Sequence, residues 1–244
     1  MEFLLFIAFV LILAIGAYLK SPRVRGARGE SKVSRRLDLF LPGGSYEIFN
    51  DVTLPTARSS TQIDHIVVSP FGVFVIETKN YSGWIFGSAR SKHWTQVLYK
   101  KKYKLFNPLW QNAHHVKAVR RFLTLPASYI FSVVVFVGNA KIKTKRKLPS
   151  NVIYLRQLRS HVRSKRERIL SKREVASITR KLRNNQTGAK QQKRAPRLAA
   201  VNAVPECPRC SAKMVKRTAT KSKYAGRKFW GCSNYPRCKG IRNI

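Results

Sequence analysis

The chain has 244 residues, with 49 Lys or Arg against 10 Asp or Glu, which gives a formal net charge of +39 and a pI near 11.2. A hydrophobic content of 44% excludes a chain that is disordered throughout. The charge is uneven, because residues 141–244 hold 31 of the basic residues and only 3 of the acidic ones. Such a self-repelling chain predicts a polyanionic partner, with nucleic acid first and anionic lipid headgroups second.

The N-terminus carries an uncharged apolar run over residues 3–19. As a helix of 17 residues it would span about 26 Å, just enough for a bilayer core. Basic residues follow the run, at Lys20, Arg23, Arg25 and Arg28. A cleaved signal peptide usually has its basic residues before the run, so we expect a membrane anchor over residues 1–20 and a cytoplasmic body after it.

After a short basic linker at residues 21–29, Val33, Leu37, Phe40 and Leu41 recur with helical spacing up to a Pro-Gly-Gly stop. The pattern then predicts strands over 46–54, 62–68 and 73–79, a hairpin over 84–86 and 94–99, a helix from 107 to about 123, strands over 132–137 and 152–155, and a basic helix over 171–183. This order is a mixed α/β (α+β) plan.

The hairpin around Pro70 and Phe71 predicts a metal site. Symmetric pairing places Asp64 opposite Glu77, with Cβ atoms about 5 Å apart. Two facing carboxylates are destabilising unless a cation neutralises them, and Lys79 shares the strand face of Glu77. Carboxylates of this kind hold Mg²⁺ for phosphodiester hydrolysis, with a lysine to orient water or stabilise charge. The alternative is an ordinary surface salt bridge between Glu77 and Lys79.

Several motifs together resemble the nuclease-related domain, NERD. They are Gly29-Glu30, Gln62-Ile63-Asp64-His65, the run Val75-Ile76-Glu77-Thr78-Lys79-Asn80 with the following Tyr81-Ser82-Gly83-Trp84-Ile85-Phe86-Gly87, and Asn107-Pro108-Leu109-Trp110-Gln111-Asn112-Ala113-His114-His115-Val116. The resemblance implies a restriction-endonuclease-like core of the PD-(D/E)xK superfamily over residues 25–155. It also implies a nuclease site made of Glu30, Asp64, Glu77 and Lys79, with Mg²⁺ or Mn²⁺ at the acids and Gln111 as an auxiliary catalytic residue.

Neighbouring polar and aromatic residues have more ordinary interpretations. Gln111 and His115 share one helix face, where they would support the site or face solvent. His65 points to the opposite strand face from Asp64. We expect the tryptophans of this region to pack in the core or the hairpin rather than to stack on bases, namely Trp84, Trp94 and Trp110.

All four cysteines lie near the C-terminus, at Cys207, Cys210, Cys232 and Cys238. Two close pairs in a cytoplasmic body predict a tetrahedral structural Zn²⁺ site whose folding depends on the metal. Two disulfides are the alternative, which that compartment disfavours.

The stretch Arg227-Lys228-Phe229-Trp230-Gly231-Cys232-Ser233-Asn234-Tyr235-Pro236-Arg237-Cys238 resembles the zinc ribbon at the C-terminus of type IA topoisomerases. The resemblance covers residues 205–241 and implies binding of DNA, chiefly single strands. Aromatic side chains beside cations support this expectation. The candidate DNA-binding residues are Arg227, Lys228, Phe229, Trp230, Tyr235 and Arg237, although Phe229 and Trp230 would equally pack the small ribbon core.

Residues 156–204 carry no motif; the first part is a basic helical segment that would contact nucleic-acid backbone, and the part past Asn184 has linker composition. Together these features predict a bacterial inner-membrane-anchored, Mg²⁺-dependent DNA endonuclease with a DNA-binding zinc ribbon. The runner-up is a non-catalytic, membrane-tethered DNA-binding protein. A third alternative is a basic protein that binds anionic lipid through residues 156–183.

Overall fold

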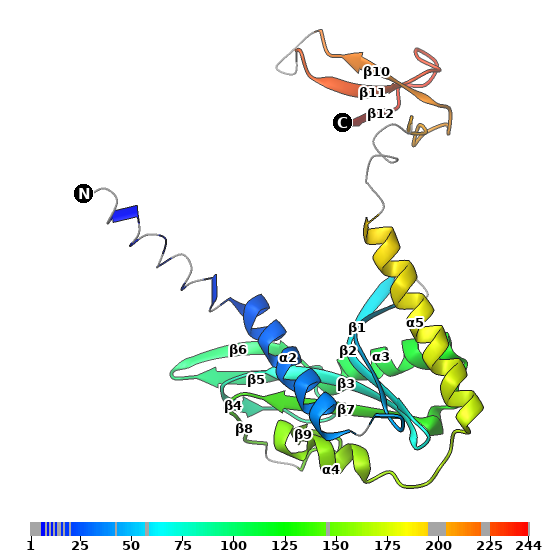
Figure 1. The fold of residues 1–244 in the computed structure, drawn as a ribbon. Coiled ribbons are helices and arrows are strands. Elements are labelled where there is room, and N and C mark those ends of the chain that lie inside the picture. Colours follow the sequence, from blue (N-terminus) through cyan, green and yellow to red (C-terminus); the bar gives the residue numbers. More distant parts are fainter. Residues whose placement is uncertain are drawn as a thin grey trace. The chain divides into compact units, whose positions relative to one another are not determined.

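The computed structural model describes residues 21–194, except 42, 57, 58, 145 and 146, residues 204–243, except 221–224, and scattered positions between 6 and 19. The chain divides into two compact units, Met1–Ala189 and Lys190–Ile244 (Figure 1). The expected anchor falls mostly outside the described residues. Among the helices that are described, none combines the length and apolarity needed to cross a membrane.

The first helix, α2 (Pro22–Phe40), begins earlier than predicted. The expected linker at residues 21–29 is wrong, because Ser21 caps the helix through a bond from the Val24 N–H and Pro22 occupies its first turn. A Ser-Pro start outweighs the basic, glycine-containing composition that suggested a linker. The helix ends at Phe40, as the Pro-Gly-Gly segment predicts, and Val33 and Leu37 are buried as expected.

The main sheet has the order β1-β2-β3-β7-β9, formed by β1 (Glu47–Pro55), β2 (Ser60–Ser69), β3 (Gly72–Asn80), β7 (Ile130–Val137) and β9 (Val152–Tyr154). The first three strands form an antiparallel meander, and β7 and β9 add to it in parallel. The helix α3 (Pro108–Leu123) lies between β3 and β7 in the chain, with Asn107 as its N-cap, as predicted. Short 3-10 turns at Ala127–Tyr129 and Leu155–Gln157 precede β7 and follow β9.

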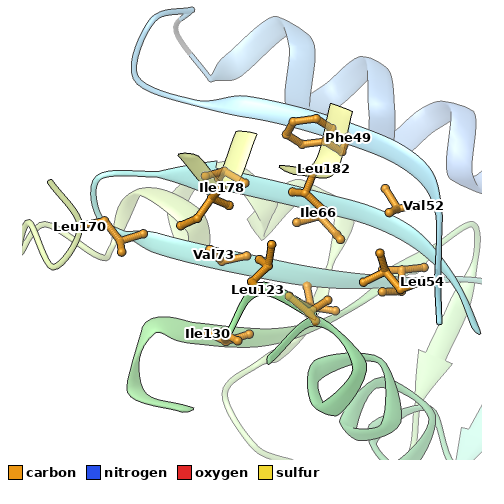
Figure 2. Close-up of a cluster of buried hydrophobic side chains, with 14 residues drawn as sticks. Phe49, Val52, Leu54, Ile66, Val73, Leu123, Ile130, Leu170, Ile178 and Leu182 are labelled. Atoms are coloured by element: carbon orange, nitrogen blue, oxygen red, sulfur yellow. The ribbon is translucent and has the colours of Figure 1, made fainter. Parts of the chain in front are cut away.

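Helices cover both faces of the main sheet (Figure 1). On one face, Leu123 of α3 and Ile178 and Leu182 of α5 (Lys172–Arg194) meet sheet residues such as Phe49 and Ile66 (Figure 2). On the other face, α2 and α4 (Leu158–Arg163) cover a second cluster. The predicted basic helix therefore exists, but it continues to Arg194, so the linker expected from Asn184 is wrong up to that residue.

A second sheet flanks the main one, with the order β6-β5-β4-β8 (Figure 1). It consists of β4 (Gly83–Phe86), β5 (His93–Leu98), β6 (Lys101–Phe106) and β8 (Ala140–Ile142). The predicted hairpin of β4 and β5 is confirmed. Trp94 from β5 packs as expected, stacked on Phe136 of β7 with ring centroids 6.2 Å apart.

The C-terminal unit is a small three-stranded antiparallel sheet. Its strands are β10 (Met214–Thr218), β11 (Lys228–Cys232) and β12 (Ile241–Asn243). Met214 packs against Cys207 and Cys232, and little other apolar surface surrounds them. The unit therefore has a very small core of its own, as the sequence predicts for a metal-dependent fold.

Candidate active site and zinc centre

A pocket of about 690 Å³ opens where β3 ends, between α2, α3 and the β5–β6 hairpin. It collects the residues that the sequence singles out for the nuclease site, Glu30, Asp64, Glu77, Lys79 and Gln111. These residues come from α2, β2, β3 and α3, so only the folded chain brings them together. The five residues predicted for one site thus line one cavity.

The register of the β2–β3 hairpin agrees with the predicted one. Its ladder runs from Ser69↔Gly72 to His65↔Ile76, which leaves Asp64 and Glu77 as the next residues on the two strands. Asp64 Oδ2 accepts a hydrogen bond of 2.7 Å from the Thr78 backbone N–H. The β2–β3 hairpin therefore places both carboxyl groups at the same end of the two strands.

Glu77 and Lys79 do not form a surface salt bridge. Glu77 is only 1% exposed, and Lys79 Nζ donates to Glu77 Oε1 at 2.5 Å and to Gln111 Oε1 at 3.0 Å. Of the two alternatives left open for Gln111, the structure shows the contact with the site rather than a side chain that faces only solvent. Forming a buried charge pair removes the hydration of both groups, so the attraction between the charges and their other hydrogen bonds must compensate for that loss. An exposed pair keeps most of its hydration.

The second oxygen of Glu77 faces a histidine. His115 Nδ1 lies 3.1 Å from Glu77 Oε2, which makes an ion pair when the imidazole is protonated, although the two atoms do not meet the geometry of a hydrogen bond. Glu77 therefore presents a buried carboxylate to the pocket, and carboxylate oxygens are ligands that Mg²⁺ prefers.

The carboxyl groups of the pocket oppose one another's ionisation. Burial, together with the charge of Glu77, raises the pKa of Asp64 to about 7, although the Thr78 N–H acts in the other direction. Burial and the charges of Asp51 and Glu77 also raise the pKa of Glu30. For Glu77 itself, burial would raise the pKa, but His115 and Lys79 outweigh it and lower the value. A divalent cation bound among these acids would stabilise their charged forms.

This electrostatic conflict predicts a stability effect at Asp64. Because its folded pKa lies near 7 rather than at the ordinary 3.8, the carboxyl lowers stability as pH rises from about 4 to about 7. Without added divalent cation, Asp64→Asn should raise the melting temperature at pH 8 by roughly 2–8 °C, with the gap closing toward pH 4. Asp38→Asn, at an exposed position on α2, is the control. Equal melting temperatures for Asp64→Asn and wild type at pH 8 would contradict the strained acid cluster.

Helix α2 carries Glu30 to the pocket through a close contact with the end of β3. A Cβ at Gly29 would lie 2.7 Å from the Cβ of Asn80, closer than side chains approach one another. Asn80 Nδ2 also donates to the Arg25 carbonyl oxygen at 2.7 Å. Glycine at position 29 therefore lets the helix approach the strand, and Asn80 holds it there.

This contact predicts opposite effects for two neighbouring glycines. Gly29→Ala should push α2 from β3 and lower the melting temperature by roughly 3–10 °C, as overpacking does. Gly26→Ala should keep or raise it, because a Cβ there meets only Glu30 Oε1 at 3.9 Å and alanine favours the helix. Thermal unfolding of both variants checks this; equal shifts would show that the approach at Gly29 is not tight.

Three neighbouring residues named in the sequence analysis do not line the pocket. His65 is buried outside the pocket, where its Nδ1 pairs with Asn50 Oδ1 at 2.7 Å, and burial lowers its pKa to about 4. It is therefore a structural histidine. Trp110 is partly exposed, and its Nε1 donates to the Ala89 carbonyl oxygen. Trp84 lies on the β4–β5 hairpin, where its ring meets Phe86 edge to face, but 52% of it is exposed.

The four cysteines form a single cluster whose sulfur atoms lie within 4.8 Å of one another. Cys207 and Cys238 Sγ are 3.7 Å apart, and Cys210 and Cys232 Sγ are 3.4 Å apart. Sulfur atoms around a tetrahedral zinc ion at 2.3 Å are about 3.8 Å apart. All four are free thiols, so the chemistry and spacing fit Zn²⁺ and not two disulfides.

Gly240 is needed for this packing. A Cβ at Gly240 would lie 2.3 Å from Cys207 Sγ. The Asn234 N–H donates to Cys232 Sγ at 3.4 Å, as expected of the surroundings of a metal thiolate.

The ribbon surface pairs aromatic rings with cations. Lys216 lies 5.3 Å from the ring centre of Trp230, and Arg217 lies 5.4 Å from that of Tyr235. Tyr235 is 58% exposed, whereas Phe229 and Trp230 are half-buried and serve the small core as well. The sequence alone does not single out Lys216 and Arg217, because only the pairing of β10 with β11 places them opposite Trp230 and Phe229.

Comparison with known proteins supports the division of the chain. Residues 25–137 match the nuclease-related domain family, and residues 204–244 match the topoisomerase DNA binding C4 zinc finger. An uncharacterized protein of Bacillus anthracis is 40% identical over 123 residues, which are 49% of this chain and 58% of the relative. No solved structure matches the chain. The chain thus carries a nuclease-related domain followed by a topoisomerase-type zinc finger.

Proposed function

We propose that this chain, with its nuclease-related domain and its zinc finger, is a divalent-metal-dependent DNA nuclease of the PD-(D/E)xK type. The observation that carries the proposal is the convergence of three acids, Glu30, Asp64 and Glu77, on one pocket beside the buried ammonium group of Lys79. Burial and the neighbouring acids raise the pKa of Asp64 and of Glu30, and a bound divalent cation would relieve this conflict.

Each residue of the pocket has a role that follows from its position. Asp64 and Glu77 would hold Mg²⁺ or Mn²⁺, which supplies polarisation of a phosphoryl oxygen and a more acidic bound water. Lys79, fixed between Glu77 and Gln111, presents its ammonium group to charge developing on the phosphate or to the attacking water. Glu30 faces the same cavity from α2 and would complete the acidic cluster or position the water. The cysteine cluster would hold Zn²⁺ and present the ribbon to DNA.

A cleavage assay with the full chain tests this proposal. Supercoiled plasmid and single-stranded DNA are incubated with Mg²⁺ or Mn²⁺, and Glu77→Gln is the negative control, since a chelator would also remove zinc from the ribbon. Glu47→Gln, at an exposed acid paired with Arg183, controls for loss of charge. Cutting by wild type and Glu47→Gln but not by Glu77→Gln supports the nuclease. Equal background cutting by all three, with DNA binding kept, would instead favour the non-catalytic DNA-binding protein.

We further propose that residues 3–19 anchor the protein to the bacterial inner membrane with its body in the cytoplasm. The support is the uncharged run and the cations that follow it. Fractionation of cells tests this: the full chain should resist alkaline extraction from membranes, and a chain with Leu11 and Leu13 both changed to Asp should be released. Extraction of the full chain at high pH would contradict the anchor.

A further inference from the structure

The solvent face of the second sheet is unusually aromatic. Along β4 the side chains alternate between exposed and buried, as in a strand covered on one side. The exposed positions are expected to be polar, yet they are Trp84 and Phe86, 52% and 38% exposed. Phe106 of β6 is 41% exposed on the same face, as the pairing of the three strands requires. Exposed aromatic groups gathered in this way mark a binding surface.

Lysines stand beside these rings in the register of the sheet. Trp84 pairs with Lys141 on one side and with Val97 on the other, and Val97 in turn pairs with Lys102. Phe86 likewise pairs with Thr95 of β5, and Thr95 in turn pairs with Lys104 of β6. Neighbouring strands lie about 4.8 Å apart, so each ring has a lysine one or two strands away. We call Trp84, Phe86, Phe106, Lys102, Lys104 and Lys141 the aromatic face.

All the charged residues of the surrounding segments are basic. Residues 81–107 and 138–148, which build the second sheet and its loops, contain 11 Lys or Arg and no Asp or Glu. Lys143 also lies over the Trp84 ring, 6.0 Å from its centre. Aromatic rings interleaved with cations and without acids fit a chain of bases and phosphates.

The aromatic face and the active-site pocket meet at the edge strand β6. Lys104 belongs to both, whereas Tyr103 and Leu105, which alternate with Lys104 along β6, line the pocket from the other face of the sheet. At the other end, Phe86 and Lys143 line a second cavity of about 640 Å³. A strand lying on the aromatic face would therefore have to pass over the β6 edge, beside Lys104, to reach the carboxylates.

Protection of a sheet edge explains only part of this pattern. Lysines on an edge strand such as β6 prevent pairing with other chains. However, β4 lies inside the sheet, between β5 and β8, and edge protection gives no reason for its exposed Trp84 and Phe86. The Trp84–Phe86 contact, edge to face at 6.4 Å, still leaves both rings open to solvent.

We propose that the aromatic face binds single-stranded nucleic acid and delivers it to the pocket. Bases stack on Trp84, Phe86 and Phe106, and the lysines contact the phosphates. Delivery to the pocket rests on the proposed nuclease function, whereas binding to the aromatic face does not require cleavage. A duplex offers no open base faces for stacking, so the face selects single strands.

Binding of labelled 20-mers by the full, zinc-loaded chain without added divalent cation tests the proposal. Trp84→Ala with Phe86→Ala should weaken binding of oligo(dT) by about tenfold or more. Trp84→Phe with Phe86→Tyr should restore it, which separates stacking from folding. Leu39→Ala, an exposed apolar position on α2, should change nothing. An oligo(rU) arm distinguishes DNA from RNA, and a duplex arm should show a smaller loss.

Photocross-linking locates the contact directly. An oligonucleotide carrying 5-iodouracil should cross-link to Trp84, Phe86 or Phe106. Cross-links confined to the ribbon with unchanged affinity in the double variant would overturn the proposal, as would loss of binding to phosphatidylserine vesicles but not to oligonucleotides. If Glu77→Gln cuts as well as wild type while the aromatic face still cross-links, the nuclease proposal fails and the binding face stands. If Glu77→Gln does not cut but the aromatic face gives no cross-links, only the binding face is rejected.

Discussion

Replacing Lys79 by Met is expected to lower the rate of DNA cleavage about a hundred- to thousandfold. Lys79 is the cation held at the carboxylates, with hydrogen bonds to Glu77 and Gln111. Methionine keeps the length of the side chain but removes the charge that would stabilise the reacting phosphate. Oligonucleotide affinity should change little, because the chain has many other lysines that are able to contact phosphates.

Single-turnover cleavage with saturating enzyme measures this effect without interference from binding. Lys117→Met, at an exposed lysine of α3, is the matched control. Melting curves check that Lys79→Met remains folded, since Glu77 loses a buried partner. A cleavage rate within twofold of wild type would remove Lys79 from the site.

Replacing Cys207 by Ser is expected to unfold the C-terminal unit. The described core of that unit is little more than Met214 and the cysteines, whereas structural zinc contributes about 10–16 kcal/mol of binding energy at neutral pH. The bound zinc should fall from one ion per chain toward none, and amide protection should vanish over residues 204–243. The affinity for single-stranded DNA should fall by roughly tenfold as the stacking groups of the ribbon lose their arrangement.

Hydrogen exchange separates this effect from general damage. Protection over β2 and β3 should remain, because they belong to the other compact unit. Ser233→Ala, next to Cys232, should keep both zinc and protection. A Cys207→Ser chain with an ordered C-terminal unit would show that zinc does not hold it together.

The strand register behind the metal-site prediction is confirmed, because local rules determine it. The Ser-Pro-Phe-Gly turn sets the hairpin register, and the two-residue period of a strand then places Glu77 and Lys79 on one face. Glu30 could not be placed in this way. It depends on the approach of α2 at Gly29, which is a tertiary contact, and only the family resemblance singled it out.

The second sheet was half predicted for a similar reason. The β4–β5 hairpin has alternating apolar residues, whereas β6 begins Lys-Lys-Tyr-Lys and β8 has only three residues. Neither has a pattern that distinguishes a strand from a loop. The exposure of Trp84 follows from which side of this sheet meets β7, and sequence periodicity alone does not specify the buried side.

The most direct test of the central claim is Mn²⁺ binding by the zinc-loaded full chain, followed by electron paramagnetic resonance. We predict binding at the pocket by wild type and by Glu47→Gln, with strong loss in Asp64→Asn and in Glu77→Gln. Cleavage should disappear in the same two variants. Equal Mn²⁺ binding by all four proteins would contradict a metal site at Asp64 and Glu77, and with it the proposed chemistry.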